Sequence, residues 1–329
     1  MAQTQGIYIV AEINDSKNPT SLTLELLGTG RQLAAETGTR LSAIVMGGDI
    51  SAAAQEVARY GADEVFVLDD AGLAQYDPEK YTEVLSSFLK DRLPLVLLAG
   101  HTSIGQDLLP RLACSLQAAL VTDCVGLKQG GGDFLFTRPI YGGNALATQK
   151  ANTDTIMATL RARVGDAPAP AQTAAAVTTV EAAPSAGSRL DFKGREIVSA
   201  RECPLEEAPV VVSGGRGMGG EEAFEQLREL AGLLGGAVGA SRPPVDSGWA
   251  PTTCQVGITG KVVAPDIYVA VALSGSTQHL SGMGESGKIV AINKDPEAYI
   301  FKVSDYGVVG DWKQVLPAFT ATLKELLQE

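Results

Sequence analysis

The sequence is poor in cysteine, histidine and aromatic residues. Its 329 residues include four cysteines and two histidines, and aromatic side chains make up 5% of the chain. The cysteines are Cys114, Cys124, Cys203 and Cys254, and the histidines are His101 and His279. Because no two cysteines form a C-x-x-C pair, the pattern predicts neither a zinc site nor a disulfide framework. We expect buried, reduced thiols.

Long apolar runs and an excess of positive charge are also missing. No run reaches the length of about 18 apolar residues that a membrane helix needs, and the opening stretch MAQTQGIYIVAEINDSKN has no targeting pattern. We therefore expect a cytoplasmic chain without membrane insertion. The 38 acidic residues outnumber 26 basic ones, for a net charge of −12. Nucleic acid is not expected as a partner, because phosphate backbones are bound by clustered Lys and Arg.

The sequence contains none of the common motifs of nucleophilic catalysis. There is no G-x-S-x-G elbow, no P-loop and no convincing Cys-His pairing. We therefore expect a chain that holds a cofactor and changes no bond in a substrate. With 45% hydrophobic and 19% charged residues, the composition is typical of a packed globular protein, and the length predicts two domains.

The first half of the chain alternates strand-like and helix-like segments. The apolar runs GIYIVAEI, LSAIVMG, DEVFVLDD and LPLVLLAG are separated by the amphipathic stretches SLTLELLGTGRQLAAETG, SAAAQEVARYG and EKYTEVLSSFLKDRL. Such a β-α-β-α series predicts a mostly parallel sheet. Beyond a helix in IGQDLLPRLACSLQ, the stretches DFLFTRPIYGGNALATQKA and DTIMATLRARV are predicted to be antiparallel strands added to an edge.

A change of composition separates the two halves. Residues 165–188 are rich in Ala and Pro, which predicts either a linker or an exposed edge strand in AVTTVEA. We place the boundary slightly later, giving domains of 1–204 and 205–329. The second domain repeats the α/β pattern with strands in PVVVS, GAVGAS, DIYVAVAL and KIVAINK and helices in EEAFEQLRELAGLLG and DWKQVLPAFTATLKELLQ. The predicted fold class is α/β, with two mostly parallel sheets flanked by helices and a Rossmann-like second domain.

A glycine-rich turn follows the first strand of the second domain. Residues 215–220 fit G-x-G-x-x-G between a predicted strand and helix, which is typical of a dinucleotide-binding turn. That fingerprint also needs an acidic residue at the end of the next strand, but this strand ends in Ala240-Ser241-Arg242. A nicotinamide site and a tight structural turn both stay open here.

Two further turns place glycine beside Ser, Thr or Gln. CQVGITGK (254–261) and LSGSTQHLSGM (273–283) are each expected to follow an apolar strand, a pattern that suits phosphates and polar ring edges. With Arg242 and AINKDP (291–296) they predict a polar lining at the carboxyl ends of strands. His279 lies within the second turn, which favours a functional role, whereas a structural role is favoured for His101.

Several motifs together resemble one known family. VVVSGGRGMGG, LLGGAVGASRPPVDSGW, QVGITGKVVAPDIYVAVALSGSTQHLSGM and IVAINKDPEAYIFKVSDYGVVGD closely resemble the alpha subunit of electron transfer flavoprotein, as do GQDLLPRLA, LVTDCVGL and RPIYGGNALA in the first domain. The resemblance implies an electron carrier whose second domain holds FAD and whose partner is a beta subunit. Flavin dehydrogenases would be its electron donors, and a membrane quinone oxidoreductase or another acceptor would receive the electrons.

The resemblance also implies which residues contact FAD. Arg242 would lie against the flavin ring, Thr259 would bond its N5, and His279 would approach its C2 carbonyl. The implied set is Arg216, Ser241, Arg242, Gln255, Val256, Gly257, Ile258, Thr259, Ser274, Gly275, Ser276, Thr277, Gln278, His279, Asn293, Asp311 and Trp312.

Arg242 has a physical reason to matter at such a site. A reduced flavin gains negative charge over N1 and the C2 carbonyl, and a nearby fixed cation stabilises that charge. Pro243 and Pro244 restrict the backbone beside Arg242, so the guanidinium is preorganised. Ile258 departs from the family, which commonly has QVGQTG at this place, and the change removes an amide beside the ring.

Two other functions stay open from the sequence. One is a nicotinamide-dependent oxidoreductase that uses the 215–220 turn, and the other is a regulatory module that binds an adenine nucleotide. Bound yellow flavin would separate the electron carrier from both. Electron bifurcation with a second flavin would depend largely on the partner subunit.

Overall fold

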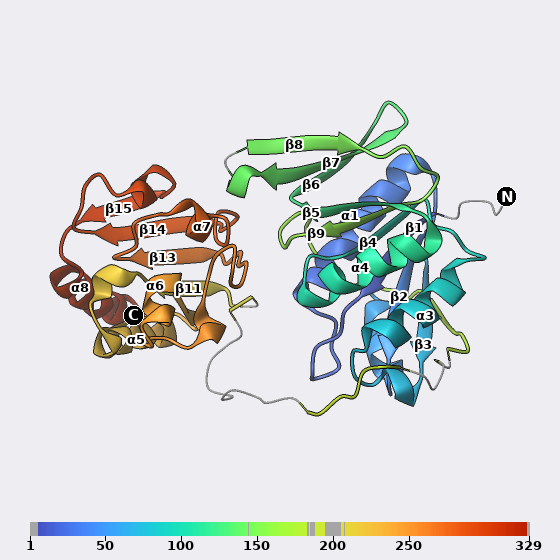
Figure 1. The fold of residues 1–329 in the computed structure, drawn as a ribbon, viewed down its shortest axis with the longest axis horizontal. Coiled ribbons are helices and arrows are strands. Elements are labelled where there is room, and N and C mark those ends of the chain that lie inside the picture. The colour runs from blue at the N-terminus through green and yellow to red at the C-terminus, as the bar shows by residue number, and fades with distance from the viewer. Residues whose placement is uncertain are drawn as a thin grey trace. The chain divides into compact units, whose positions relative to one another are not determined.

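The computed structural model describes residues 6–143, 145–182, 184, 188–194, 205–206 and 208–327. The chain divides into two units, Met1–Ile140 with Leu146–Gly194 and Tyr141–Ala145 with Arg195–Glu329. Each unit is built on a parallel sheet with helices packed against it, so the predicted fold class is confirmed (Figure 1). Cys203 lies outside the described residues.

The first unit has a seven-stranded parallel sheet in the order β10-β3-β2-β1-β4-β9-β5. Its strands are β1 (Ile7–Ala11), β2 (Leu41–Gly47), β3 (Glu64–Asp69), β4 (Val96–Gly100), β5 (Ala119–Cys124), β9 (Ile156–Leu160) and β10 (Ala176–Thr179). Its helices are α1 (Ser21–Thr37), α2 (Ser51–Val57), α3 (Pro78–Leu89) and α4 (Ser103–Leu116).

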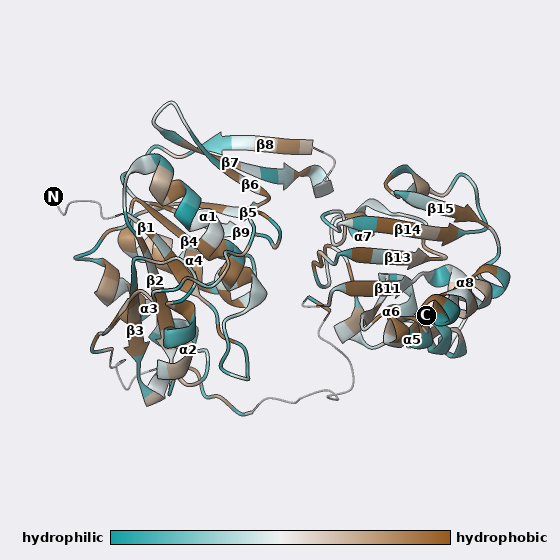
Figure 2. Cartoon of the chain, turned by 180° about the vertical axis from the view of Figure 1, so that it is seen from behind, coloured by the Kyte–Doolittle hydropathy of each residue, from teal (hydrophilic) through white to brown (hydrophobic). Residues whose placement is uncertain are grey.

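Helices cover both faces of this sheet, which explains why its central strands are apolar throughout. Side chains alternate between faces along a strand, so Ile7 and Ile9 of β1 pack into one core while Tyr8 and Val10 pack into the other. Figure 2 shows the apolar colour concentrated in the strands of both units.

Short polar signals set the helix ends. The Thr20 hydroxyl accepts a hydrogen bond from the backbone of Thr23 at the start of α1, and the Asp77 carboxylate accepts two at the start of α3. Gly38 ends α1 with φ +66°, a left-handed conformation that glycine adopts without steric cost.

One strand prediction is wrong. The stretch DTIMATLRARV contains β9, which pairs parallel with both β4 and β5 inside the main sheet. All five β9 residues are buried, because the strand lies between the hydrophobic clusters on the two faces of the sheet; a local pattern cannot tell such a strand from an edge strand. The preceding residues form a separate three-stranded sheet of β6 (Gly126–Gly130), β7 (Asp133–Ile140) and β8 (Ala145–Lys150), where β6 and β7 are antiparallel.

The Ala/Pro-rich segment contributes an edge strand. Within residues 165–188, β10 pairs parallel with β3 at the edge of the sheet, and three of its four residues are exposed. The edge-strand alternative for AVTTVEA is therefore confirmed.

The cysteine prediction holds in part. Cys124 and Cys254 are buried cysteines that form no disulfide with another described residue, but Cys114 is exposed. Burial is wrong for Cys114 because α4 buries the stripe formed by Leu108, Leu109 and Leu112 and turns position 114 outward. Across the described residues, no group of three or more His, Cys, Asp or Glu could hold a metal ion. None of the described helices is long and apolar enough to span a membrane.

The second unit has a five-stranded parallel sheet in the order β12-β11-β13-β14-β15. Its strands are β11 (Val210–Gly214), β12 (Ala237–Ala240), β13 (Ile267–Val271), β14 (Lys288–Asn293) and β15 (Tyr306–Val309). Its helices are α5 (Phe224–Leu233), α6 (Arg242–Asp246), α7 (Thr277–Leu280) and α8 (Trp312–Leu326).

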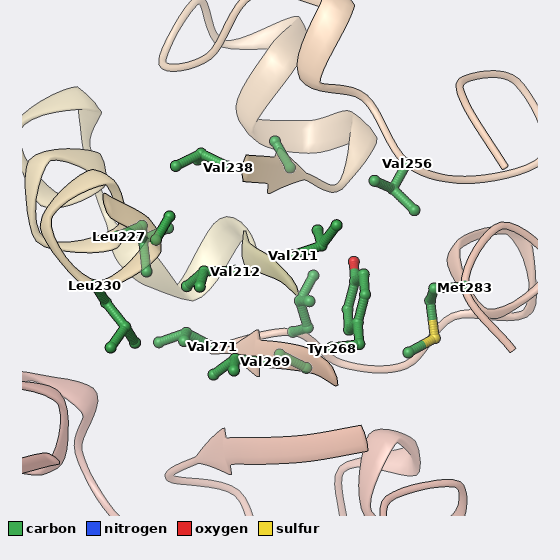
Figure 3. Packing of buried hydrophobic residues seen from close by; sticks show 14 of the residues in the cluster. Val211, Val212, Leu227, Leu230, Val238, Val256, Tyr268, Val269, Val271 and Met283 are labelled. Atoms are coloured by element: carbon green, nitrogen blue, oxygen red, sulfur yellow. The ribbon is translucent and has the colours of Figure 1, made fainter. Parts of the chain in front are cut away.

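The two faces of this second sheet are packed differently. Val212, Val269 and Val271 face the α5 side chains Leu227 and Leu230, as Figure 3 shows. On the opposite face, Val211 and Tyr268 lie against Val256 and Met283, which come from irregular segments. Helices thus cover one face, and the turns of the candidate site cover the other.

Two glycines at the end of α5 test this packing. A Cβ on Gly232 would have no described neighbour within 4 Å, so Gly232→Ala should raise the free energy of unfolding by about 0.5–1 kcal/mol through helix propensity. A Cβ on Gly236 would lie 2.3 Å from the Val210 carbonyl oxygen, so Gly236→Ala should lower that free energy by about 2 kcal/mol. Both tryptophans, Trp249 and Trp312, lie in the second unit, so urea unfolding followed by tryptophan fluorescence reports on it alone. Equal effects of the two substitutions would contradict this packing.

Candidate functional site

The strands of the second sheet end together at one edge. Residue pairing joins Gly214 of β11 to Ala240 of β12 and Val271 of β13, and it continues through β14 to β15. Because the strands are parallel, the segments that follow them emerge side by side. Residues of the predicted site follow every strand: Arg216 after β11, Ser241 and Arg242 after β12, residues 274–279 after β13, Asn293 at the end of β14, and Asp311 with Trp312 after β15.

The 255–260 segment joins this edge through β12. Ala240 forms an isolated parallel bridge with Gln255, and the Val256 N–H donates to the Ala240 carbonyl at 2.9 Å. The prediction that this turn follows an apolar strand is wrong, because α6 and the 3-10 turn Thr252–Cys254 precede it. Glycine beside Thr or Gln indicates a turn, but it does not show whether a strand or a helix precedes that turn.

The 255–260 segment is also tied to the segment after β13. The Ile258 N–H donates to the Gln278 carbonyl at 2.8 Å. Gly257 has φ +143°, and a Cβ there would lie 2.7 Å from the same carbonyl oxygen, so only glycine fits. The structure thus brings together two turns that lie about one strand apart in the sequence.

Polar side chains and one apolar side chain are exposed at this edge. The exposed residues of the predicted set with side chains are Arg216, Arg242, Ile258, Thr259, Ser274, Ser276, Gln278 and Asp311. Gln255 Nε2 donates to Thr259 Oγ1 at 2.9 Å, which orients the threonine hydroxyl. The Arg216 side chain has no hydrogen bond or ion pair to any described residue, so its guanidinium is available to an anion.

Arg242 is the first residue of α6 and carries a partner that the sequence reasoning missed. Its Nε donates to Asp246 Oδ2 at 3.2 Å, one helical turn away, and the two side chains are 65% and 59% exposed. The i, i+4 spacing of Arg242 and Asp246 is the sequence feature that could have indicated this ion pair. An exposed pair of this kind is worth about 0–1 kcal/mol, so Arg242 can be shared with a bound anion at little cost.

His279 is buried and has partners at both ring nitrogens. Nε2 lies 2.8 Å from the Tyr268 hydroxyl, and Nδ1 lies 3.0 Å from the Val256 carbonyl oxygen. Burial lowers the pKa of His279 to about 4. Tyr268 is a second residue that the sequence reasoning missed; it is fully buried on β13, and the only signal was a tyrosine inside an apolar strand.

The remaining predicted residues shape the edge from below. Asn293 Nδ2 donates to the Leu273 carbonyl at 2.7 Å, the Asp311 carboxylate caps α8, and Trp312 Nε1 donates to the Gly217 carbonyl at 3.0 Å. A Cβ on Gly215 would lie 2.1 Å from the Ala272 carbonyl oxygen. The glycine at that position of the 215–220 turn therefore has a packing reason of its own. Ser241, Val256, Gly257 and Gly275 are buried, and Thr277 is half-buried.

His101 lies in the first unit, in a network of its own. Its Nδ1 is 2.8 Å from Thr159 Oγ1 and its Nε2 is 3.3 Å from Asp123 Oδ1. Asp123 also pairs with Arg161 through two contacts of 2.5 and 3.0 Å. Burial lowers the pKa of His101 despite the carboxylate beside it.

The chain matches two domains of one known protein family. Residues 7–185 match the electron transfer flavoprotein domain, and residues 204–284 match the electron transfer flavoprotein FAD-binding domain. The chain belongs to the electron transfer flavoprotein family. The predicted resemblance to its alpha subunit is thereby confirmed, with electron transfer as the function and FAD as the cofactor.

Similarity to curated members of the electron transfer flavoprotein family extends over nearly the whole chain. Protein FixB of Clostridium saccharobutylicum is 40% identical over 99% of this chain and 98% of its own length. The electron transfer flavoprotein subunits alpha of Thermoanaerobacterium thermosaccharolyticum and Bacillus subtilis are 40% and 38% identical, over 99% and 97% of this chain and 100% and 98% of their own lengths.

The residues at the edge fit an FAD. Its diphosphate needs cationic partners, and Arg216 and Arg242 are exposed after neighbouring strands. Its ring and ribose present polar edges, and the hydroxyl or amide groups of Thr259, Ser274 and Gln278, which could bond such edges, are exposed at the same end of the sheet. Ile258, which is 58% exposed, offers apolar surface for a ring face. This donor set contains the cations, the hydrogen-bonding groups and the apolar surface that a dinucleotide requires.

The buried histidine predicts a pH effect on stability. The pKa of His279 is about 4 in the folded state, below the ordinary value of 6.5. As the pH falls from 6.5 towards 4, His279 is protonated in the unfolded state but stays neutral in the folded state. The free energy of unfolding therefore decreases over this pH range. We expect His279 to remove about 2 kcal/mol from the free energy of unfolding between pH 7 and pH 5. His279→Gln, whose amide can still bond both partners, should flatten this dependence.

Urea unfolding followed by tryptophan fluorescence at both pH values measures the effect in the second unit. His101→Gln serves as the control, because His101 lies in the first unit. Identical pH dependences for wild type and His279→Gln would show that His279 is not buried in its neutral form.

Proposed function

We propose that this chain is the FAD-holding alpha subunit of a heterodimer with an electron transfer flavoprotein beta subunit. It accepts electrons from flavin dehydrogenases and passes them to a membrane quinone oxidoreductase or another downstream acceptor. The chain itself forms and breaks no substrate bond. Domain 205–329 binds FAD and domain 1–204 contacts the beta subunit.

The observation that carries this proposal is the carboxyl edge of the β11–β15 sheet. Residues from all five strand ends lie along it, and the full-length similarity to the family runs through the same segments. We propose that Arg216 and Arg242 bind the anionic parts of FAD and that Thr259, Ser274, Ser276 and Gln278 bond its polar edges. Ser241, Gln255, Val256, Gly257, Gly275, Thr277, His279, Asn293, Asp311 and Trp312 hold these groups in place.

Arg242 has the largest effect on electron transfer in this proposal. A flavin that accepts an electron gains charge, and a cation beside it stabilises the reduced form more than the oxidised form. Asp246 opposes that effect, because its carboxylate lies 3.2 Å from the guanidinium and cancels part of its field. The two residues should therefore tune the flavin in opposite directions.

Substitutions at this pair test the proposal. Arg242→Ala should lower the first reduction potential of the bound flavin by roughly 50–100 mV, and Asp246→Asn should raise it by a smaller amount. Both potentials are measured by spectroelectrochemical titration of the FAD-loaded heterodimer, at low and high ionic strength. Salt should shrink both shifts, because the two side chains are exposed.

A control uses another arginine–carboxylate pair of the same unit. Arg228 pairs with Glu225 at 2.5 Å on α5, which packs on the sheet face opposite the one that Val256 and Met283 cover. Arg228→Ala should leave the potential unchanged. Unchanged potentials in both Arg242→Ala and Asp246→Asn would place the flavin ring elsewhere. If Arg228→Ala shifts the potential as much as Arg242→Ala does, the shift reflects the net charge of the chain and not the position of Arg242.

A further inference from the structure

The hydroxyl of Tyr268 is a polar group inside an apolar layer. Tyr268 is 0% exposed and lies beside Val211 on the sheet face that Val256 and Met283 cover (Figure 3). A buried hydroxyl without a partner destabilises a fold, so its contacts are expected to be specific. Its partner is His279 Nε2 at 2.8 Å.

The second contact of the ring decides where the imidazole carries its proton. Nδ1 faces the Val256 carbonyl oxygen at 3.0 Å, and a carbonyl oxygen can only accept a hydrogen bond. Nδ1 must therefore carry the proton in this arrangement. The ring is neutral, so Nε2 keeps its lone pair and accepts the hydrogen bond that Tyr268 donates. The tautomer follows from these two partners.

The same ring holds a turn of the candidate site in place. The Val256 carbonyl belongs to the 255–260 segment, and His279 belongs to α7 after β13. A Cβ on Gly282 would lie 2.4 Å from the Gly257 nitrogen, which shows how closely the two segments pack. A rotation of the imidazole would break the bond to Val256 and loosen the segment that carries Ile258 and Thr259.

We propose that Tyr268 is a positioning residue that holds His279 as the Nδ1–H tautomer and, through this ring, fixes the 255–260 turn. In this arrangement the single N–H of His279 is used by the protein backbone, which differs from the role at the flavin C2 carbonyl that the family resemblance implies. Resting on the proposed function, the FAD site would then receive its positive charge from Arg242 and Arg216, with His279 acting as a neutral support.

The first test needs no substitution. The full chain, labelled with 15N-histidine and bound to its unlabelled partner subunit, is studied by NMR near pH 7. We expect His279 to show a protonated Nδ1 and an unprotonated Nε2. The chain has only one other histidine, so comparison with His101→Gln assigns the signals. A protonated Nε2, alone or together with Nδ1, would overturn the proposal.

Tyr268→Phe is the second test, since it removes the hydroxyl and keeps the ring volume. The Nε2 signal should shift to the position of an unprotonated nitrogen without a hydrogen bond, and solvent exchange of the Nδ1 proton should become about tenfold faster. Tyr306→Phe removes a hydroxyl from a residue that is 64% exposed on β15 and should change neither signal. An unchanged Nε2 signal in Tyr268→Phe would overturn the proposal.

The consequence for the cofactor is measured separately. FAD should dissociate with a constant about tenfold higher in Tyr268→Phe than in wild type, because the turn it contacts is less well held. The histidine signals report on the positioning role whether or not FAD binds. If wild type fails to bind FAD while the signals behave as expected, the proposed function fails and the positioning role stands. If Tyr268→Phe loses the Nε2 bond and keeps wild-type FAD affinity, the ring does not support the cofactor site.

Discussion

Parallel pairing of the strands in the second unit is the constraint on which the candidate site depends. Five segments that are far apart in the sequence reach one edge because β12, β11, β13, β14 and β15 all run in the same direction. Their backbone hydrogen bonds fix the register, so each following turn starts at a defined height. No single turn could supply two guanidiniums, several hydroxyls and an apolar side chain over one surface. The sheet makes that combination possible.

The two faces of this sheet have different roles. One face packs against helix α5 through aliphatic side chains and provides stability (Figure 3). The other face is covered by the turns themselves, and there two polar side chains are buried and bonded to each other, Tyr268 and His279. Buried polar pairs restrict geometry more than they add stability, because any displacement leaves a polar group unpaired. The turns of the site are thus fixed from beneath while their outer side chains stay exposed.

Positive charge is exposed at the edge of the sheet that carries the candidate site. The chain is strongly acidic overall, yet two exposed arginines lie at the ends of neighbouring strands. Arg216 has no charged partner among the described residues, and the partner of Arg242 is an exposed aspartate that screens only part of its field. An anionic cofactor is attracted to these positions, whereas nucleic acid would meet an acidic surface elsewhere.

The sequence predicts the strands and long helices well, because their apolar periodicity reflects burial on both faces. It fails for β9, whose apolar run is compatible with either a central or an edge strand, and for the 254–261 turn, where the preceding element is a short helix. Motifs and family resemblance indicate the positions of Arg242 and His279. Asp246 is indicated as a partner only by its i, i+4 spacing from Arg242. Tyr268 could not be identified as a partner of His279, since a buried hydrogen bond depends on three-dimensional distances that no local pattern encodes.

The central claim is that the edge of the second sheet holds a redox-active FAD. The most direct test is the visible absorption spectrum of the chain purified with its beta subunit, followed through stepwise chemical reduction. The account predicts a two-band flavin spectrum that bleaches on reduction and returns on reoxidation. A colourless, folded heterodimer that cannot be loaded with FAD would contradict it.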